Sequence, residues 1–275
     1  MEEIILNNGI RLPFLGLGTY PMNGFTLLKT VVFATKLGYR SFDAAAAYGN
    51  ERYVGYGIKL TLRDRKFFFI TTKLSNTQQR NGNVRASLYK SLKLLKTNYV
   101  DLYLMHWPNP DTYLDSWKQM EKLYEEGLVR AIGVCNFHEH HLEKLLSISK
   151  VVPAVNQIEL HPLLTQKPLI EFCKKYDIRV QAYSPLAKMH EKLVSNQKLS
   201  RLSKKYNKSI PQIILRWNYQ NGIIGIPKTK NMKRLKENIS IFDFDLSYEE
   251  IKEIDNLNEG FRVRYNPDNC DFSKL

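Results

Sequence analysis

The sequence predicts an α/β fold in which eight parallel strands alternate with helices and close into a (β/α)8 barrel, the TIM barrel. Short apolar, β-favouring runs recur eight times along the chain, and stretches with helical periodicity separate them. No linker, low-complexity segment or change of composition divides the 275 residues. We therefore expect residues 1–275 to form a single (β/α)8 barrel domain, for which this is a normal length.

Several of the apolar runs are continuous, which is typical of a sheet that helices cover on both faces. The expected strands lie at residues 14–20, 40–46, 67–73, 101–107, 130–137, 154–160, 179–186 and 222–229. Ahead of them, "LNNGIRL" (6–12) carries Asn8-Gly9, the dipeptide that most favours a tight hairpin turn. We expect this N-terminal β-hairpin to plug the bottom of the barrel, at the N-terminal ends of its strands.

Helical periodicity is clearest between the third and fourth expected strands. Val84, Leu88, Leu92 and Leu95 recur at spacings that place them on one face of a helix within 83–96. The same pattern occupies 138–149, 166–176 and 249–257, the last behind Ser247, a residue type that caps helix N-termini. Residues 187–221 hold two more helical patterns. Residues 258–275 have no periodicity, and we expect them to form a C-terminal tail on the substrate side of the barrel.

Charge and composition exclude several classes of function. The net charge of +14 and the pI near 9.5 are compatible with a nucleic-acid partner. The basic residues are spread along the chain without a recognition motif or an aromatic platform, so we expect no nucleic acid. No apolar run approaches the roughly 20 residues of a membrane span, so we expect no membrane partner. The three cysteines are scattered and the N-terminus does not resemble a secretory signal, which favours a cytoplasmic location.

Polar residues stand at the ends of the expected strands. They are Asp43, Tyr48, Lys73, His106, Asn136, Gln157, Tyr183, Ser184 and Lys228. The carboxyl ends of parallel barrel strands meet at one rim, where barrel enzymes build their active sites. Each residue also has a structural interpretation, as a packed, capping or solvated side chain. Their shared position favours a functional one.

Asp43, Tyr48, Lys73 and His106 form a consistent set for protonating an oxygen. A phenol beside an ammonium is a tuned proton donor, because the cation stabilises the phenolate and lowers the pKa of Tyr48. Asp43 is expected to keep Lys73 charged and in place, and His106 to orient a substrate oxygen. This chemistry suits carbonyl reduction, and the set offers no activated serine or cysteine nucleophile.

Seven ordered motifs resemble the successive signatures of the aldo-keto reductases. They are GYRSFDAAAAYGNE, ITTKL, DLYLMHWP, GVCNF, NQIELHP, AYSPL and IPKTKNMKRLKEN. The likeness covers essentially the whole chain and looks nearest to bacterial members that reduce diketo-gluconate, methylglyoxal and other small carbonyls. The resemblance implies NADPH-dependent reduction of aldehydes or ketones to alcohols by a monomeric enzyme, with Tyr48 as general acid.

The resemblance also implies a binding site for NADPH/NADP+. The nicotinamide would stack on Tyr183, and Lys228, Thr229 and Arg234 would bind the 2′-phosphate. The complete implied set is Thr19, Tyr20, Asp43, Cys135, Asn136, Gln157, Tyr183, Ser184, Leu186, Pro227, Lys228, Thr229, Arg234, Glu237 and Asn238. The residues themselves agree at one point, since cations at a helix start favour an anion. No G-x-G-x-x-G motif follows a strand, so a Rossmann fold is not indicated.

The expected substrate pocket is aromatic. Its residues are Tyr20, Tyr48, His106, Trp107 and Phe137, with parts of the tail around "YNPDNCDF" (265–272). Many relatives in the family carry Trp in place of Tyr20, Thr in place of Ala44, and Ser in place of Cys135 and Thr229. None of these departures removes a catalytic group, but Tyr20 leaves the substrate specificity less defined than the chemistry.

Three other functions fit parts of the sequence. A sensor that binds NADPH without turnover would not need all four catalytic residues. A short-chain-type dehydrogenase would carry its Tyr and Lys on one helix behind a glycine-rich loop. A metal-dependent hydrolase is suggested by "HEHH" (138–141). That motif begins a helix and lacks a carboxylate partner at the rim, so we expect a solvated helix start and no metal.

Overall fold

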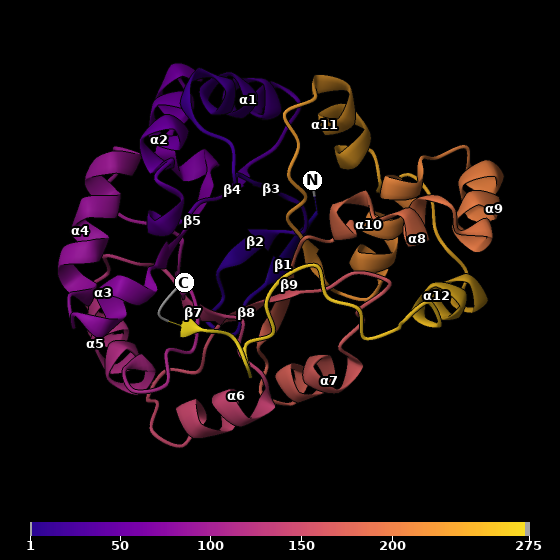
Figure 1. Cartoon of the computed structure of the whole chain (residues 1–275). Helices are drawn as coiled ribbons and strands as arrows, with labels where there is room; N and C mark the ends of the chain where they lie inside the picture. The colour runs from indigo at the N-terminus through magenta and orange to yellow at the C-terminus, as the bar shows by residue number, and fades with distance from the viewer. Residues whose placement is uncertain (1, 273–275) are drawn as a thin grey trace.

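Eight parallel strands run in chain order around a central barrel in the computed structural model, which describes residues 2–272 (Figure 1). The strands are β3 (Gly16–Gly18), β4 (Ser41–Asp43), β5 (Phe69–Leu74), β6 (Leu102–Met105), β7 (Ile132–Cys135), β8 (Val155–Glu159), β9 (Arg179–Tyr183) and β10 (Ile224–Gly225). All eight coincide with strands expected from the sequence, most with shorter bounds. The predicted (β/α)8 barrel is confirmed.

The first and last barrel strands meet at a narrow seam. Leu15 forms a parallel bridge with Gly225, and the Gly18 amide donates to the Pro227 carbonyl over 3.2 Å. A Cβ atom at Gly18 would lie 2.6 Å from the Ile226 carbonyl oxygen. Gly18 is therefore needed for this close approach of two backbones.

Helices surround the barrel and separate its strands (Figure 1). They are α1 (Gly24–Lys36), α2 (Glu51–Leu60), α3 (Asn76–Arg80), α4 (Val84–Leu95), α5 (Tyr113–Glu125), α6 (Glu139–Leu146), α7 (Lys167–Lys175), α8 (Glu191–Val194), α9 (Gln197–Tyr206), α10 (Ile210–Gln220), α11 (Met232–Ile239) and α12 (Tyr248–Asp255). The expected helices in 83–96, 138–149, 166–176 and 249–257 are α4, α6, α7 and α12. The two patterns in 187–221 are α9 and α10, which the short η3 (Ala187–Met189) and α8 precede. Ser247 caps α12 as expected, accepting from the Glu250 amide.

The main core lies between the barrel and its helices. In α4, Val84, Leu88, Leu92 and Leu95 are all buried in it, on the face that their spacing predicts. Each such side chain contributes about 1.5–3 kcal/mol relative to its exposed state. This packing fixes the strand ends that carry the site.

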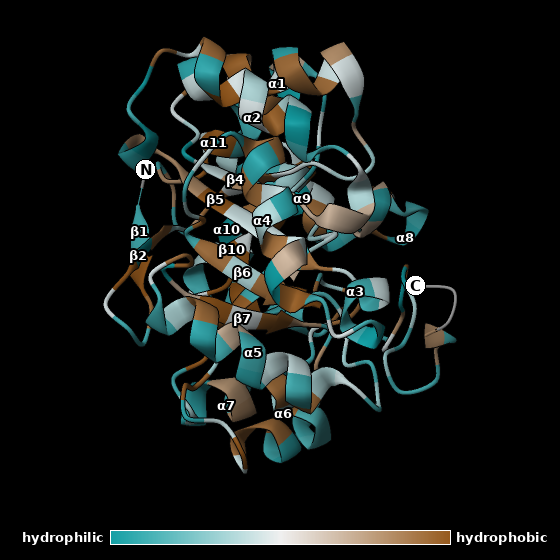
Figure 2. Ribbon diagram, turned by 90° about the vertical axis from the view of Figure 1, so that its left-hand side faces the viewer, coloured by the Kyte–Doolittle hydropathy of each residue, from teal (hydrophilic) through white to brown (hydrophobic). Residues whose placement is uncertain are grey.

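The N-terminal hairpin covers the bottom of the barrel, as expected. It consists of β1 (Glu3–Ile5) and β2 (Arg11–Pro13), and Gly9 takes the left-handed backbone (φ 82°) that the turn requires. Leu6 and Leu12 pack with interior residues of the barrel, including Leu102 and Leu104. Figure 2 shows the hairpin at one end of the barrel and the C-terminal end of the chain at the other.

The tail from residue 258 to residue 272 has no long helix and crosses the mouth of the barrel in the view of Figure 1. Its amides at Val263 and Arg264 donate to the Glu159 carboxylate at the end of β8. Among residues 2–272, no helix combines the length and the apolar character that a bilayer crossing requires.

Candidate active site

The four predicted catalytic residues occupy neighbouring strand ends at one rim. Asp43 ends β4, Lys73 is the penultimate residue of β5, and His106 follows β6. Tyr48 ends η1 (Ala46–Tyr48), the short turn that follows β4. The structure therefore brings the sequence-predicted set together.

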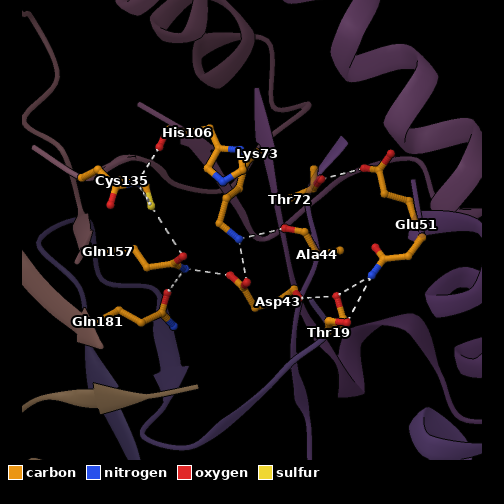
Figure 3. A network of polar contacts seen from close by, with 12 residues as sticks. Thr19, Asp43, Ala44, Glu51, Thr72, Lys73, His106, Cys135, Gln157 and Gln181 are labelled. Carbon is orange, nitrogen blue, oxygen red and sulfur yellow. Dashed lines mark hydrogen bonds and ion pairs between the residues drawn. The ribbon is translucent and has the colours of Figure 1, made fainter. Parts of the chain in front are cut away.

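Lys73 lies at the centre of this group (Figure 3). Its side chain has no exposed surface, and its Nζ donates to Asp43 Oδ1 over 2.6 Å and to the Ala44 carbonyl over 2.9 Å. Burial acts to lower the pKa of Lys73, but the Asp43 carboxylate outweighs it and the pKa is raised. Lys73 is therefore a permanent cation, 5.1 Å from the centroid of the Tyr48 ring.

The pKa of Tyr48 corrects one expectation from the sequence. Burial raises this pKa to about 12, while the Lys73 ammonium acts to lower it and Asp43 to raise it. Lys73 thus acts in the predicted direction, but desolvation of the phenolate is the larger effect. In this structure the phenol holds its proton throughout the neutral range.

His106 is neutral. Burial and the nearby Lys73 cation lower its pKa to about 3. Its ring stands edge-on to that of Tyr48, with the centroids 5.6 Å apart. A neutral imidazole so placed can donate one hydrogen bond to an oxygen beside the phenol.

The alanine run between Asp43 and Tyr48 lets the chain turn tightly above the barrel. Gly49 ends η1 with a left-handed backbone (φ 63°). Asn50 then donates to Thr19 Oγ1 over 3.0 Å, and Thr19 Oγ1 donates to the Asp43 carbonyl over 2.8 Å. Thr19 is fully buried. It therefore anchors this turn and, in this structure, exposes no surface to a cofactor ribose.

Two amides extend the network around Asp43 inside the barrel, and a separate bond joins β5 to α2 (Figure 3). Gln157 Nε2 donates to Asp43 Oδ2 over 2.7 Å and to Gln181 Oε1 over 2.8 Å. On the other side, Thr72 Oγ1 donates to the buried Glu51 over 2.6 Å. The sequence analysis assigns no role to Gln181, Thr72 or Glu51. Gln181 and Thr72 are polar residues inside otherwise apolar strands, and Glu51 directly follows the AYGN turn; these are the signals that mark them.

A tyrosine and an amide form a platform after β7 and β9. Tyr183 is partly buried, and its hydroxyl donates to Asn136 Oδ1 over 2.6 Å. Asn136 Nδ2 donates in turn to the His106 carbonyl over 2.9 Å. These bonds fix the Tyr183 ring at the rim. The neighbouring Cys135 is buried, and burial raises the pKa of its thiol, which fits an inert side chain.

A second group of predicted residues surrounds the N-terminus of α11. Lys228 and Arg234 are exposed, and neither forms an ion pair with another described residue. Thr229 Oγ1 accepts from the Asn231 amide, and Asn231 caps the helix. Two unpaired cations at a helix N-terminus make a surface suited to a phosphate.

The remaining implied cofactor residues lie close to these two groups in the chain. Ser184 and Leu186 follow β9, and Ser184 has a left-handed backbone (φ 47°). Pro227 is buried at the barrel seam. Glu237 and Asn238 lie in the last turns of α11, half-buried and buried respectively.

The residues of the expected aromatic pocket lie in different environments. Tyr20 is 45% exposed, and its ring centroid is 5.0 Å from that of Tyr48. Trp107 contacts Phe272 of the tail, with centroids 6.5 Å apart. Phe137 is a correction: it has no exposed surface and packs edge-on against Tyr113 in the core. Asn136, just before Phe137, has a left-handed backbone (φ 66°). This breaks the strand's alternation of inward and outward side chains, so Phe137 does not point toward the rim.

The "HEHH" segment differs from expectation. The segment does begin α6, as predicted, but a carboxylate lies beside it. Asp268 of the tail is 2.8 Å from His138 Nδ1 and 3.7 Å from His140 Nε2. The sequence did not indicate this partner, because 130 residues separate His138 from Asp268.

Comparison with known proteins identifies the family. The model of the aldo/keto reductase family matches residues 15–259. The chain is 47% identical over 268 residues to the glyoxal reductase of Bacillus subtilis, covering 97% of this chain and 96% of that protein. It is 41% identical over 267 residues to the methylglyoxal reductase DkgA of Escherichia coli K12, covering 96% of each.

Solved structures share the fold. The aldo-keto reductase AKR2E4 of Bombyx mori, in complex with NADP, superimposes with a TM-score of 0.91 at 36% identity, covering 97% of this chain and 96% of that one. The aldo-keto reductase MGS-M4, from a deep-sea metagenome library, gives 0.93 at 40% identity, covering 98% and 99%. The chain therefore belongs to the aldo/keto reductase family and is a carbonyl-reducing oxidoreductase with a nicotinamide cofactor.

Proposed function

We propose that this protein reduces small aldehydes and ketones to alcohols with NADPH, and that Tyr48 is the general acid. The observation that carries the proposal is the position of Tyr48. Its phenol stands beside the buried Lys73–Asp43 pair and edge-on to the neutral His106 ring. Such an arrangement suits an oxygen that gains a proton as negative charge develops on it.

Three side chains at the site could donate a proton: His106, Lys73 and Tyr48. Only Tyr48 fits that role. His106 has its pKa near 3, so its imidazolium is scarce at neutral pH. Lys73 has no exposed surface and cannot reach a substrate. Tyr48 is protonated, with its pKa near 12, and partly exposed.

Lys73 and Asp43 act through Tyr48. When the O–H bond of Tyr48 breaks and its proton passes to the carbonyl oxygen, a phenolate remains. The ammonium of Lys73 stabilises that phenolate, and Asp43 holds the ammonium in place. Water at the open rim then returns a proton to Tyr48. His106 donates a hydrogen bond to the same carbonyl oxygen and so orients it.

The residues present fit a nicotinamide cofactor. A reduced nicotinamide supplies a hydride to the carbonyl carbon and is itself oxidised, so the two-electron reduction balances with the proton from Tyr48. Tyr183 offers a fixed, partly exposed aromatic face for a flat ring. The side-chain amide of Asn136 lies beside that face. The amide of Gln157 can bind the nicotinamide carboxamide once it gives up its hydrogen bond to Asp43. The solved structure of the Bombyx mori relative contains NADP, which supports the same assignment.

We assign the preference for NADPH over NADH to Lys228, Thr229 and Arg234. The two cofactors differ by a 2′-phosphate, and the exposed cations at the start of α11 lack a carboxylate partner among the described residues. A phosphate there gains charge-assisted hydrogen bonds.

We assign small dicarbonyl compounds as the substrate class. The relatives named as glyoxal and methylglyoxal reductases support it. Tyr20 is exposed beside the Tyr48 ring and offers aromatic surface to such a substrate. All four catalytic side chains come from one chain, so we propose the monomer as the working unit.

The test is the loss of NADPH absorbance with methylglyoxal, phenylglyoxal, a nitrobenzaldehyde and a diketo-sugar acid. Tyr48→Phe should lower kcat by about 100-fold to 10,000-fold, the usual contribution of a general acid. NADPH should still quench the protein fluorescence of this variant. Tyr56→Phe, on the outer surface of α2, is the matched control and should retain full activity.

Two results contradict the proposal in different ways. Tight NADPH binding without turnover on any carbonyl would favour the sensor function. Turnover that survives Tyr48→Phe would remove the general acid and leave the reaction class intact.

A further inference from the structure

A cluster of imidazoles and a carboxylate joins the start of α6 to the C-terminal tail. His138, His140 and His141 come from the helix start, and Asp268 comes from the tail. The cluster is separate from the proposed catalytic residues and does not depend on the proposed reaction.

Three of these side chains are arranged as ligands. One ligand atom each of His140, His141 and Asp268 lies within 4.8 Å of the other two. A tetrahedral ion with bonds of about 2.1 Å places its ligand atoms about 3.4 Å apart. His140 Nε2 and Asp268 Oδ1 already lie 3.7 Å apart, close to that spacing, and the 62% exposed side chain of His140 has room to adjust.

His141 is held in position by the fold. Its ring packs edge-on to Phe137 and Tyr113, with centroids 5.8 and 6.4 Å away. Its Nδ1 accepts from the His138 amide over 3.2 Å. Nε2 is consequently the nitrogen left for a ligand. The adjacent His140 ring is only 3.9 Å away between centroids.

His138 orients the carboxylate. Its Nδ1 lies 2.8 Å from Asp268 Oδ2, and its Nε2 lies 3.1 Å from Arg262 NH2. Arg262 can only donate, so Nε2 accepts and the Nδ1 proton points to Asp268. A histidine that donates to a ligating carboxylate fixes the orientation of that carboxylate. Arg262, the cation facing the cluster, is bonded to His138 and does not occupy a ligand atom.

We propose that His140, His141 and Asp268 form a binding site for a borderline divalent transition-metal ion such as Zn2+, with water as a further ligand. Two imidazoles and one carboxylate are a donor set that zinc accepts in proteins. The hard ions Mg2+ and Ca2+ prefer sites built from oxygen, so the donor set disfavours them.

An ion at this site would tie the tail to α6. Beyond Asp268, the tail reaches Phe272, which contacts Trp107 and whose carbonyl accepts from Arg80 over 2.9 Å. The ion would therefore restrain the segment that covers Trp107 at the rim. Hydrogen exchange of residues 263–272 should slow when the ion binds.

The test is a calorimetric titration of the untagged full chain with Zn2+ in a buffer that does not chelate it. We expect one saturable site per chain. Replacement of Zn2+ by Co2+ should give the visible absorption of a tetrahedral ion. His140→Ala and Asp268→Asn should each weaken binding at least about tenfold. His138→Ala should weaken it about tenfold, because Asp268 loses the hydrogen bond that orients it. Glu143→Gln, an exposed carboxylate elsewhere on α6, is the matched control and should bind like the wild type.

Circular dichroism and an unchanged quench by NADPH verify that each variant is folded. Absence of saturable binding overturns the proposal. So does binding that His140→Ala and Asp268→Asn leave unchanged. Binding that is lost only in Cys270→Ser would assign the ion to that half-buried thiol and equally overturn it.

Discussion

Lys73 Nζ and Asp43 Oδ1 lie 2.6 Å apart in an ion pair from which solvent is almost excluded. The Lys73 side chain is 0% exposed and that of Asp43 is 4% exposed. Two further bonds complete the pair, from Lys73 to the Ala44 carbonyl and from Gln157 to Asp43 Oδ2. Such a pair costs desolvation energy, and the barrel fold supplies the geometry that offsets it.

Removing one partner should therefore destabilise the protein strongly. Lys73→Met leaves the Asp43 carboxylate buried without its cation, and we expect a loss of about 3–5 kcal/mol in the free energy of unfolding. Lys73→Met/Asp43→Asn removes both charges and should lose clearly less, while activity stays absent in both variants. Urea denaturation measures the difference. If the double variant loses as much stability as Lys73→Met, or more, the two charges are not coupled.

The proton donor determines the pH dependence of reduction. Tyr48 is competent while protonated, below its pKa of about 12, and His106 is competent while neutral, above its pKa of about 3. The kcat/KM of reduction should thus show no titration step in the neutral range. The measurement is a pH profile of NADPH oxidation at low carbonyl concentration. A neutral step that disappears in His106→Gln would assign proton transfer to the imidazole instead.

Lys228 and Arg234, near the start of α11, should make the protein bind NADPH more tightly than NADH. Each charge-assisted bond to a phosphate contributes about 1.5–3 kcal/mol, equivalent to about a 10-fold to 100-fold change in Kd. Arg234→Ala and Lys228→Ala should weaken NADPH binding by that factor and leave NADH binding nearly unchanged. Fluorescence titration with both cofactors measures this. Lys236→Ala, exposed in the last turn of α11, is the control. A parallel loss for NADH would place these cations elsewhere on the cofactor.

The sequence predicted the barrel and the four rim residues for one physical reason. Parallel strands are buried on both faces, so each appears as an apolar run, and a polar residue at its end stands out. Asp43, Lys73 and His106 could be placed from this alone, because β4, β5 and β6 are adjacent in both sequence and space.

Features that depend on burial or on distant contacts could not be predicted. Lys73 acts on Tyr48 in the expected direction, yet the net shift of the Tyr48 pKa depends on desolvation, which only packing determines. Phe137 adjoins a rim residue in the sequence, but a backbone change at Asn136 places it in the core. Asp268 meets His138 because the irregular tail crosses the barrel mouth, and no periodicity marks that path.

The barrel seam gives a last prediction, which concerns stability alone. Gly18→Ala places a Cβ 2.6 Å from the Ile226 carbonyl oxygen, and this oxygen belongs to backbone that cannot rotate away. The strands β3 and β10 must separate, and we expect a loss of about 1–3 kcal/mol in the free energy of unfolding. Gly225→Ala, at the same seam, meets no atom closer than 3.4 Å and is the matched control. Denaturant midpoints of the two variants measure the effect. If Gly18→Ala unfolds at the same denaturant concentration as Gly225→Ala, the seam tolerates a side chain and its close backbone approach does not limit barrel closure.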